Sequence, residues 1–66
     1  MTTLISNREV FIEFHTIGQF VKVTAMDTAT MTEISIQGSA SSSETTLKTA
    51  ALRRLEYVLK KNGVIE

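Results

Sequence analysis

The sequence contains no cysteine, only three glycines and a single histidine among its 66 residues. Without cysteine, no disulfide, thiolate nucleophile or thiolate metal ligand is available. The glycines are isolated from one another, so none of them belongs to a phosphate-binding glycine loop. A single histidine cannot build a multi-histidine site within one chain. These absences predict a protein that holds no cofactor, no metal ion and no small-molecule substrate.

An excess of charge of one sign and a long apolar run are also lacking. Seven Lys and Arg residues balance seven Asp and Glu residues, so the formal net charge is zero. This balance argues against a general polyanion binder. No apolar run approaches the roughly 20 residues that a transmembrane helix needs, and residues 1–7 lack the features of a secretion signal. We therefore expect a cytoplasmic protein without a membrane partner.

The composition that remains is that of one small globular domain. Hydrophobic residues make up 42% of the chain, and no low-complexity segment interrupts it. Residues 1–8 show no periodicity and are interpreted as a flexible N-terminal tail, which leaves residues 9–66 as the domain. A core of this size rarely contributes more than about 3–5 kcal/mol of net stability. We expect either a tightly packed core or support from self-association.

Alternating apolar and polar residues predict two strands around Gly18, from 9 to 15 and from 20 to 26. A turn centred on residues 17 and 18 pairs Phe14 with Val21. The simplest geometry is a type II turn in which Gly18 has a positive φ angle. The pattern therefore predicts an antiparallel β-hairpin.

A third strand is expected from 33 to 37, after a threonine-rich turn that begins at Asp27, whose side chain can bond back to its own backbone. The apolar positions of the three strands fall on one side, which we call the core face. It comprises Val10, Ile12, Phe14, Val21, Val23, Ala25, Ile34 and Ile36.

The C-terminal third of the chain predicts a helix. Ser41 and Glu44 fit a capping box at its start, and the helix continues to about Lys61 without glycine or proline. Gly63 suits the left-handed position after the helix, and Val64 can then pack back on its last turn. One side of this helix is apolar, with Leu47, Ala51, Leu52, Leu55, Val58 and Leu59.

These elements predict an α+β fold: a three-stranded antiparallel meander (β-β-β-α) with one C-terminal helix packed on one face. The other side of the sheet is the spare face, with Phe11, Glu13, His15, Phe20, Lys22, Thr24, Met26, Glu33, Ser35 and Gln37. Three of its residues are more apolar than a solvated face requires, namely Phe11, Phe20 and Met26. Together with His15 they form the candidate partner surface of a small non-catalytic protein-interaction module. The alternative interpretation is that these side chains pack over the strand edges and against the tail.

Catalysis is weakly supported. Glu13 and His15 lie two residues apart on one strand, which resembles an acid–base pair. Lys22 is a better partner for Glu13, and a flat sheet lacks the concave pocket of a catalytic site. Serines 41–43 belong to the start of the helix and have no nearby base. We therefore assign no catalytic residue and expect that the protein is not an enzyme.

RNA binding is the alternative function. The β-β-β-α order, with Arg53 and Arg54 in the helix, resembles the C-terminal part of a double-stranded RNA-binding domain. Such domains hold RNA by lysines at the helix start, where this chain has Glu44 and, further on, Lys48. An N-terminal helix is also absent. The candidate RNA contacts are Lys48, Arg53, Arg54, Lys60 and Lys61, but the sequence argues more strongly for a protein partner or self-association.

The segments 11–27, 33–38 and 47–59 resemble a family of short alphaproteobacterial proteins known only as a domain of unknown function. The likeness covers roughly residues 9–61, and its most specific part is the stretch from Leu52 to Leu59. The resemblance implies a free-standing bacterial cytoplasmic protein. It supplies no catalytic or binding residue.

Overall fold

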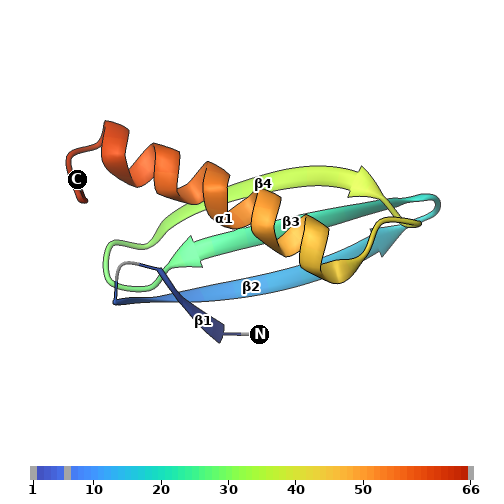
Figure 1. The fold of residues 1–66 in the computed structure, drawn as a ribbon, viewed down its shortest axis with the longest axis horizontal. Helices are drawn as coiled ribbons and strands as arrows, with labels where there is room; N and C mark the ends of the chain where they lie inside the picture. The colour runs from blue at the N-terminus through green and yellow to red at the C-terminus, as the bar shows by residue number, and fades with distance from the viewer. Residues whose placement is uncertain (1, 6, 66) are drawn as a thin grey trace.

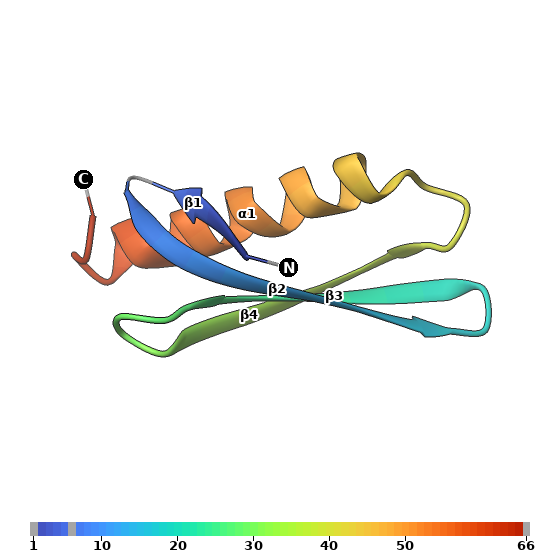
Figure 2. The ribbon, with the colours of Figure 1, turned by 90° about the horizontal axis from the view of Figure 1, so that it is seen from below.

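The computed structural model describes residues 2–5 and 7–65 (Figure 1). The elements follow in the order β1 (Thr2–Ile5), β2 (Arg8–Ile17), β3 (Phe20–Asp27), β4 (Thr32–Ser39) and α1 (Glu44–Lys61). The strands form one sheet in the order β1-β2-β3-β4, and all neighbours are antiparallel. Figure 2 shows α1 on one side of this sheet. The predicted α+β class with one C-terminal helix is confirmed.

The prediction of three strands is wrong, because the sheet has a fourth strand at the N-terminus. The segment 2–5, part of the predicted flexible tail, pairs with β2 from Arg8 to Phe11. Asn7 adopts a φ of 62° between these strands, a left-handed conformation that asparagine tolerates better than most residues. A strand of four residues is too short for alternation to stand out from chance. Residues 1 and 6 of the predicted tail lie outside the described residues.

The hairpin exists, but its register differs from the predicted one by two residues. Phe14 faces Val23 rather than Val21, and the two-residue turn consists of Gly18 and Gln19. Gly18 has a φ of 60° at the first turn position, the pattern of a type II′ turn. This turn matches the right-handed twist of the strands, whereas the predicted type II turn would splay them. A shift of two residues keeps every side chain on its predicted face.

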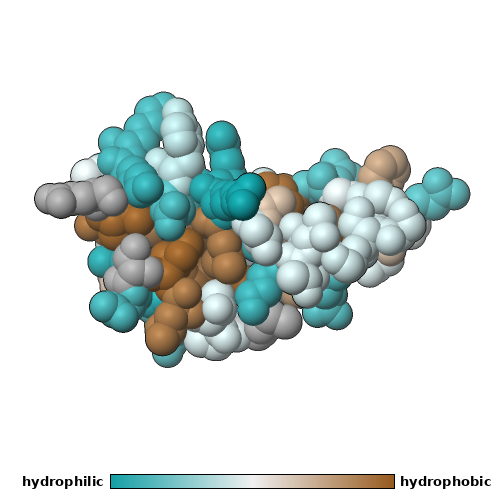
Figure 3. Space-filling model, viewed as in Figure 1, coloured by the Kyte–Doolittle hydropathy of each residue, from teal (hydrophilic) through white to brown (hydrophobic). Residues whose placement is uncertain are grey.

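The core lies between the sheet and α1. Its buried apolar residues are Val10, Ile12, Val21, Val23, Ala25, Leu47, Ala51, Leu55 and Leu59. The predicted core face is therefore confirmed, although Phe14, Ile34 and Ile36 are only half-buried at its margins. Figure 3 shows apolar residues gathered at the end of the molecule that carries β1 and the C-terminal half of α1.

The helix begins two residues later than predicted. Ser43 is the N-cap, and its Oγ accepts a hydrogen bond from the Thr46 backbone N–H at 3.1 Å. Ser41 instead donates its backbone N–H to Ser39 Oγ at 3.2 Å, so it belongs to the turn after β4. Glu44 is the first helical residue, where its charge favours the helix dipole. The predicted Ser41–Glu44 capping box is therefore wrong.

The predicted end of the helix is confirmed. Gly63 has a φ of 76° and donates its N–H to the carbonyl of Lys60 at 3.0 Å. Val64 donates to the carbonyl of Leu59 at 2.9 Å and packs against the core. The two bonds form a Schellman motif, which satisfies the carbonyls at the end of the helix.

Gly38 lets the first turn of α1 approach the sheet closely. It follows Ile34 and Ile36 on the core side of β4, and a methyl group at this position would overlap Leu47. Leu47 therefore rests on the backbone of β4 and closes the core at this end.

Candidate functional site

The spare face is organised in rows that run across the strands, because directly paired residues point to the same side. From one end of the sheet to the other, the rows are Leu4–Glu9, then Thr2–Phe11–Met26–Glu33, then Glu13–Thr24–Ser35, then His15–Lys22–Gln37, then Ile17–Phe20–Ser39. The helix lies on the opposite side (Figure 2). The spare face is thus not covered by any described element.

One end of the spare face carries an apolar cluster, the first patch, made of Leu4, Phe11 and Met26. Phe11 lies directly opposite Met26 and is 42% exposed, while Met26 is half-buried. Leu4 lies opposite Glu9 on the same side and is 68% exposed. A shallow depression of about 300 Å³ adjoins the cluster. Its lining comprises Phe11, Glu13, Lys22, Thr24, Met26 and Glu33.

The other end carries the second patch, made of Ile17 and Phe20. These residues face each other directly before the hairpin turn and are 54% and 55% exposed. Large apolar side chains are therefore concentrated at both ends of the spare face. The two rows between them are polar or charged, with Glu13, Thr24, Ser35, His15, Lys22 and Gln37.

The predicted partner residues share one face but do not form one cluster. Met26 joins Phe11, whereas Phe20 lies six residues from Met26 along β3, or about 20 Å. His15 is exposed and faces Lys22, so it lies in the polar band between the two patches. Sequence reasoning missed Ile17, which was placed in the turn because of the register error. It also missed Leu4, because residues 1–8 show no periodicity and therefore predict a tail.

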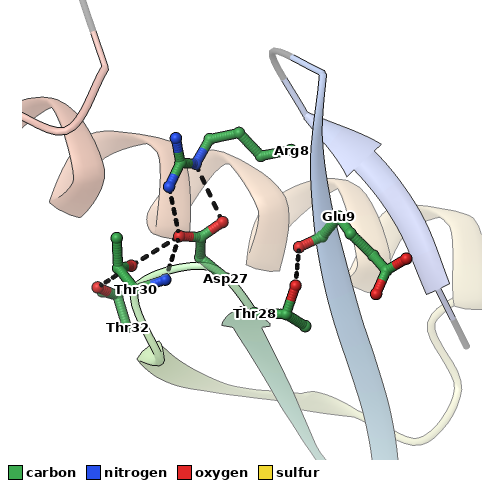
Figure 4. Close-up of polar contacts among 6 residues, drawn as sticks. All are labelled: Arg8, Glu9, Asp27, Thr28, Thr30 and Thr32. Atoms are coloured by element: carbon green, nitrogen blue, oxygen red, sulfur yellow. Dashed lines mark hydrogen bonds and ion pairs between the residues drawn. The ribbon is translucent and has the colours of Figure 1, made fainter.

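A buried ion pair lies on the core face of the sheet, at the end where β2 begins and β3 ends (Figure 4). Asp27 at the end of β3 is fully buried, and Arg8 at the start of β2 approaches it with its side chain 23% exposed. Arg8 donates from Nε to Oδ1 at 3.0 Å and from Nη2 to Oδ2 at 2.9 Å. This bidentate geometry is the strong form of the arginine–carboxylate interaction.

The same carboxylate also holds the turn between β3 and β4. Thr30 donates to Asp27 Oδ2 from its backbone N–H at 3.2 Å and from its hydroxyl at 2.6 Å. The Thr30 hydroxyl lies 2.7 Å from that of Thr32. The prediction that Asp27 bonds back to its own turn is confirmed. This turn also contains Met31 with a φ of 59°.

These contacts fix the charge of Asp27. The hydrogen bonds from Arg8 lower the pKa of Asp27 to about 2, and those from Thr30 act in the same direction, while burial opposes them. The same pairing raises the pKa of Arg8. The carboxylate is ionised at neutral pH, and its protein partners occupy both oxygens. Its chemistry is therefore structural: it joins β2, β3 and the following turn.

The Glu13–His15 combination is not drawn into a shared site. Glu13 lies opposite Thr24 rather than the predicted Lys22, and His15 lies opposite Lys22. Within residues 2–5 and 7–65, no group of three or more His, Asp or Glu side chains is placed to hold a metal ion. No described helix has the length and apolarity needed to cross a lipid bilayer.

Four of the five candidate RNA contacts, namely Arg53, Arg54, Lys60 and Lys61, are exposed within an arc of about 120° on α1, and Lys48 lies apart from them. Lys48 is half-buried, and helical geometry places it about 140° around the axis from Arg53. Arg54 lies over the ring of Tyr57, with 5.5 Å from its guanidinium carbon to the ring centre. Lys60 Nζ lies 3.6 Å from Glu56 Oε1. The four exposed basic side chains thus share one side of α1, and two of them, Arg54 and Lys60, contact neighbouring side chains.

Comparison with known proteins gives one result that bears on identity. No curated protein matches the chain, and no solved structure matches it. A family described as a domain of unknown function, DUF6898, matches residues 7–62, which include β2, β3, β4 and α1. The match leaves β1 outside and contains both members of the Arg8–Asp27 pair. The chain belongs to this family of domains of unknown function.

Proposed function

We propose that this chain is a small, non-catalytic protein-interaction module that contacts another protein through its spare face. The observation that carries the proposal is the exposure of Phe11 and Phe20 on a sheet face that α1 does not cover. Aromatic side chains with this exposure are typical anchors of protein interfaces, where single residues can contribute about 2 kcal/mol or more.

The distribution of charge supports a specific partner. The band between the two patches includes the acidic residue Glu13 and the basic residue Lys22, with His15 beside it. Charges of both signs between apolar anchors favour a partner with a complementary pattern and disfavour a simple polyanion. We extend the proposal to the setting of the protein, which we take to be the cytoplasm of an alphaproteobacterium. Fractionation of the source cells and immunoblotting test this location.

The test of the proposal is capture of the partner from an extract of the source cells. A tagged wild-type chain is compared with the double variant Phe11→Ser, Phe20→Ser and with the control Tyr57→Ser. Tyr57 is also exposed but lies on α1, away from the spare face. Extracts are treated with nuclease, and co-purified proteins are identified by mass spectrometry. Folding of each variant is checked by circular dichroism.

We expect the wild type and Tyr57→Ser to recover the same protein and the double variant to lose it. The purified partner should then bind the wild type at least about tenfold more tightly than the double variant. Equal recovery by all three chains overturns the proposal. Recovery of nucleic acid that nuclease removes, with no protein left, also overturns it and favours RNA binding through α1.

A further inference from the structure

The outer edge of β4 is long, regular and unprotected. The strand has eight residues, and its pairing with β3 continues from Ser39 to Thr32 without a bulge. Its sequence contains no proline, lysine or arginine. Proteins usually protect exposed edges with such residues, with bulges or with short strands, because an open edge can pair with another chain. Within the described part of the chain, no strand pairs with this edge.

The opposite edge of the sheet is divided between two strands. It is formed by the four-residue β1 and, beyond it, by residues 12–17 of β2. A short edge strand is one of the devices that discourage edge pairing, whereas β4 offers eight residues in one uninterrupted strand. The contrast singles out β4 as the edge that accepts another strand.

Apolar side chains follow β4 on the helix side. Ile34 and Ile36 are half-buried at the margin of the core. Leu47 contacts Gly38, so this flank of α1 lies over β4. Val58 follows Leu47 by eleven residues, about three helical turns, so it lies on the same flank, and it too is half-buried. An apolar strip of Ile34, Ile36 and Val58 therefore borders the open edge.

Two copies of the β4 edge can pair without placing like charges opposite one another. Glu33 is the single charged residue of β4. When two copies of β4 pair antiparallel about a two-fold axis at Ser35, Glu33 faces Gln37 of the second copy. An axis at Ile36 places it opposite Ser39. In either register no like charges meet, and like charges directly opposite one another would destabilise the pairing.

We propose that two copies of this chain associate through antiparallel pairing of their β4 strands. Because the two-fold axis is perpendicular to the sheet, the result is a continuous eight-stranded sheet with both helices on one side. Pairing satisfies the open backbone groups and covers Ile34 and Ile36 of both copies. The stability gained by pairing matters for a domain of 66 residues, because its core alone provides limited stability. The inference does not depend on the proposed function, since it uses a different surface.

Sedimentation velocity of the purified chain from micromolar to millimolar concentration tests the association. Ser35→Lys places a protecting charge on the β4 edge at an exposed position, and Thr49→Lys is the matched control on exposed α1. We expect the wild type and the control to dimerise, and Ser35→Lys to weaken dimerisation at least about tenfold. A wild type that stays monomeric throughout, or a dimer that Ser35→Lys leaves unchanged, overturns the proposal.

A second measurement examines the geometry directly. The chain has no cysteine, so thiols introduced by Ser35→Cys and Gln37→Cys are the only ones present. An axis at Ser35 predicts oxidative cross-linking of Ser35→Cys with itself, and an axis at Ile36 predicts cross-linking between the two variants. Glu13→Cys on β2 is the control and should not cross-link. A dimer that yields neither cross-link refutes β4 pairing. So does a dimer that is disrupted by Phe11→Ser with Phe20→Ser but is unaffected by Ser35→Lys.

Discussion

The Arg8–Asp27 pair makes the stability of the domain depend on acid pH in a way that can be calculated. The pKa of Asp27 falls from its ordinary 3.8 to about 2 in the folded chain. Between these values the unfolded chain binds a proton that the folded chain does not bind. The free energy of unfolding should therefore decrease as the pH falls from about 5 to about 2. Above this window the contribution of Asp27 is fully present.

The size of the effect follows from the shift. One pKa unit corresponds to about 1.4 kcal/mol. Because Arg8 is partly exposed and solvent screens its charge, we expect a contribution of about 1–2 kcal/mol, less than the energy that the whole pKa shift would correspond to. The substitution Asp27→Asn keeps the shape of the side chain and removes its charge. The stability difference between wild type and Asp27→Asn should therefore shrink by about 1–2 kcal/mol between neutral pH and about pH 2.

Urea unfolding followed by far-UV circular dichroism, at a series of pH values, measures this difference. Glu33→Gln is the matched control, because it removes one negative charge from an exposed position of the neighbouring strand. Its difference from the wild type should change less across the same window. If the wild type and Asp27→Asn lose stability in parallel from neutral pH to about pH 2, the ion pair does not stabilise the fold and the reasoning is refuted.

Three further predictions concern the fold. Leu55→Ala leaves a cavity in the core and should cost about 2–5 kcal/mol, whereas exposed Tyr57→Ala should change the unfolding free energy by less than about 0.5 kcal/mol in urea titrations. Gly18→Val should lower the thermal midpoint, because a β-branched residue at a φ of 60° costs about 1–2 kcal/mol; an unchanged midpoint would contradict the type II′ turn. Ser43→Ala should cost about 1 kcal/mol and Ser41→Ala much less in the same assay, and the reverse order would contradict the observed N-cap.

The faces of the sheet could be predicted from the sequence because they depend only on whether a position is odd or even. The register error of two residues placed Phe14 opposite Val21 instead of Val23, and both of these valines lie on the core side. The end of α1 was also predictable, since Gly63 and Val64 carry a local signal. Local signals did not resolve its start, because each of three consecutive serines can act as an N-cap.

Features that depend on distant residues were not predictable. Arg8 and Asp27 are 19 residues apart, and neither belongs to a pattern that requires the other. The pair follows from the register of β2 with β3, which places the start of one strand beside the end of the other. The spare face was predictable as a surface, but its division into two patches was not. Alternation determines which side Phe11 and Phe20 occupy, whereas their separation depends on the register.

The division of the spare face sets a minimum length for any ligand that uses all of it. A molecule that touches both patches must present two apolar groups about 20 Å apart. An extended peptide needs about six residues to span this distance, and a helix needs about thirteen. A compact metabolite can occupy one patch at most. The spacing of the patches would thus favour those macromolecular partners whose apolar residues lie the same distance apart.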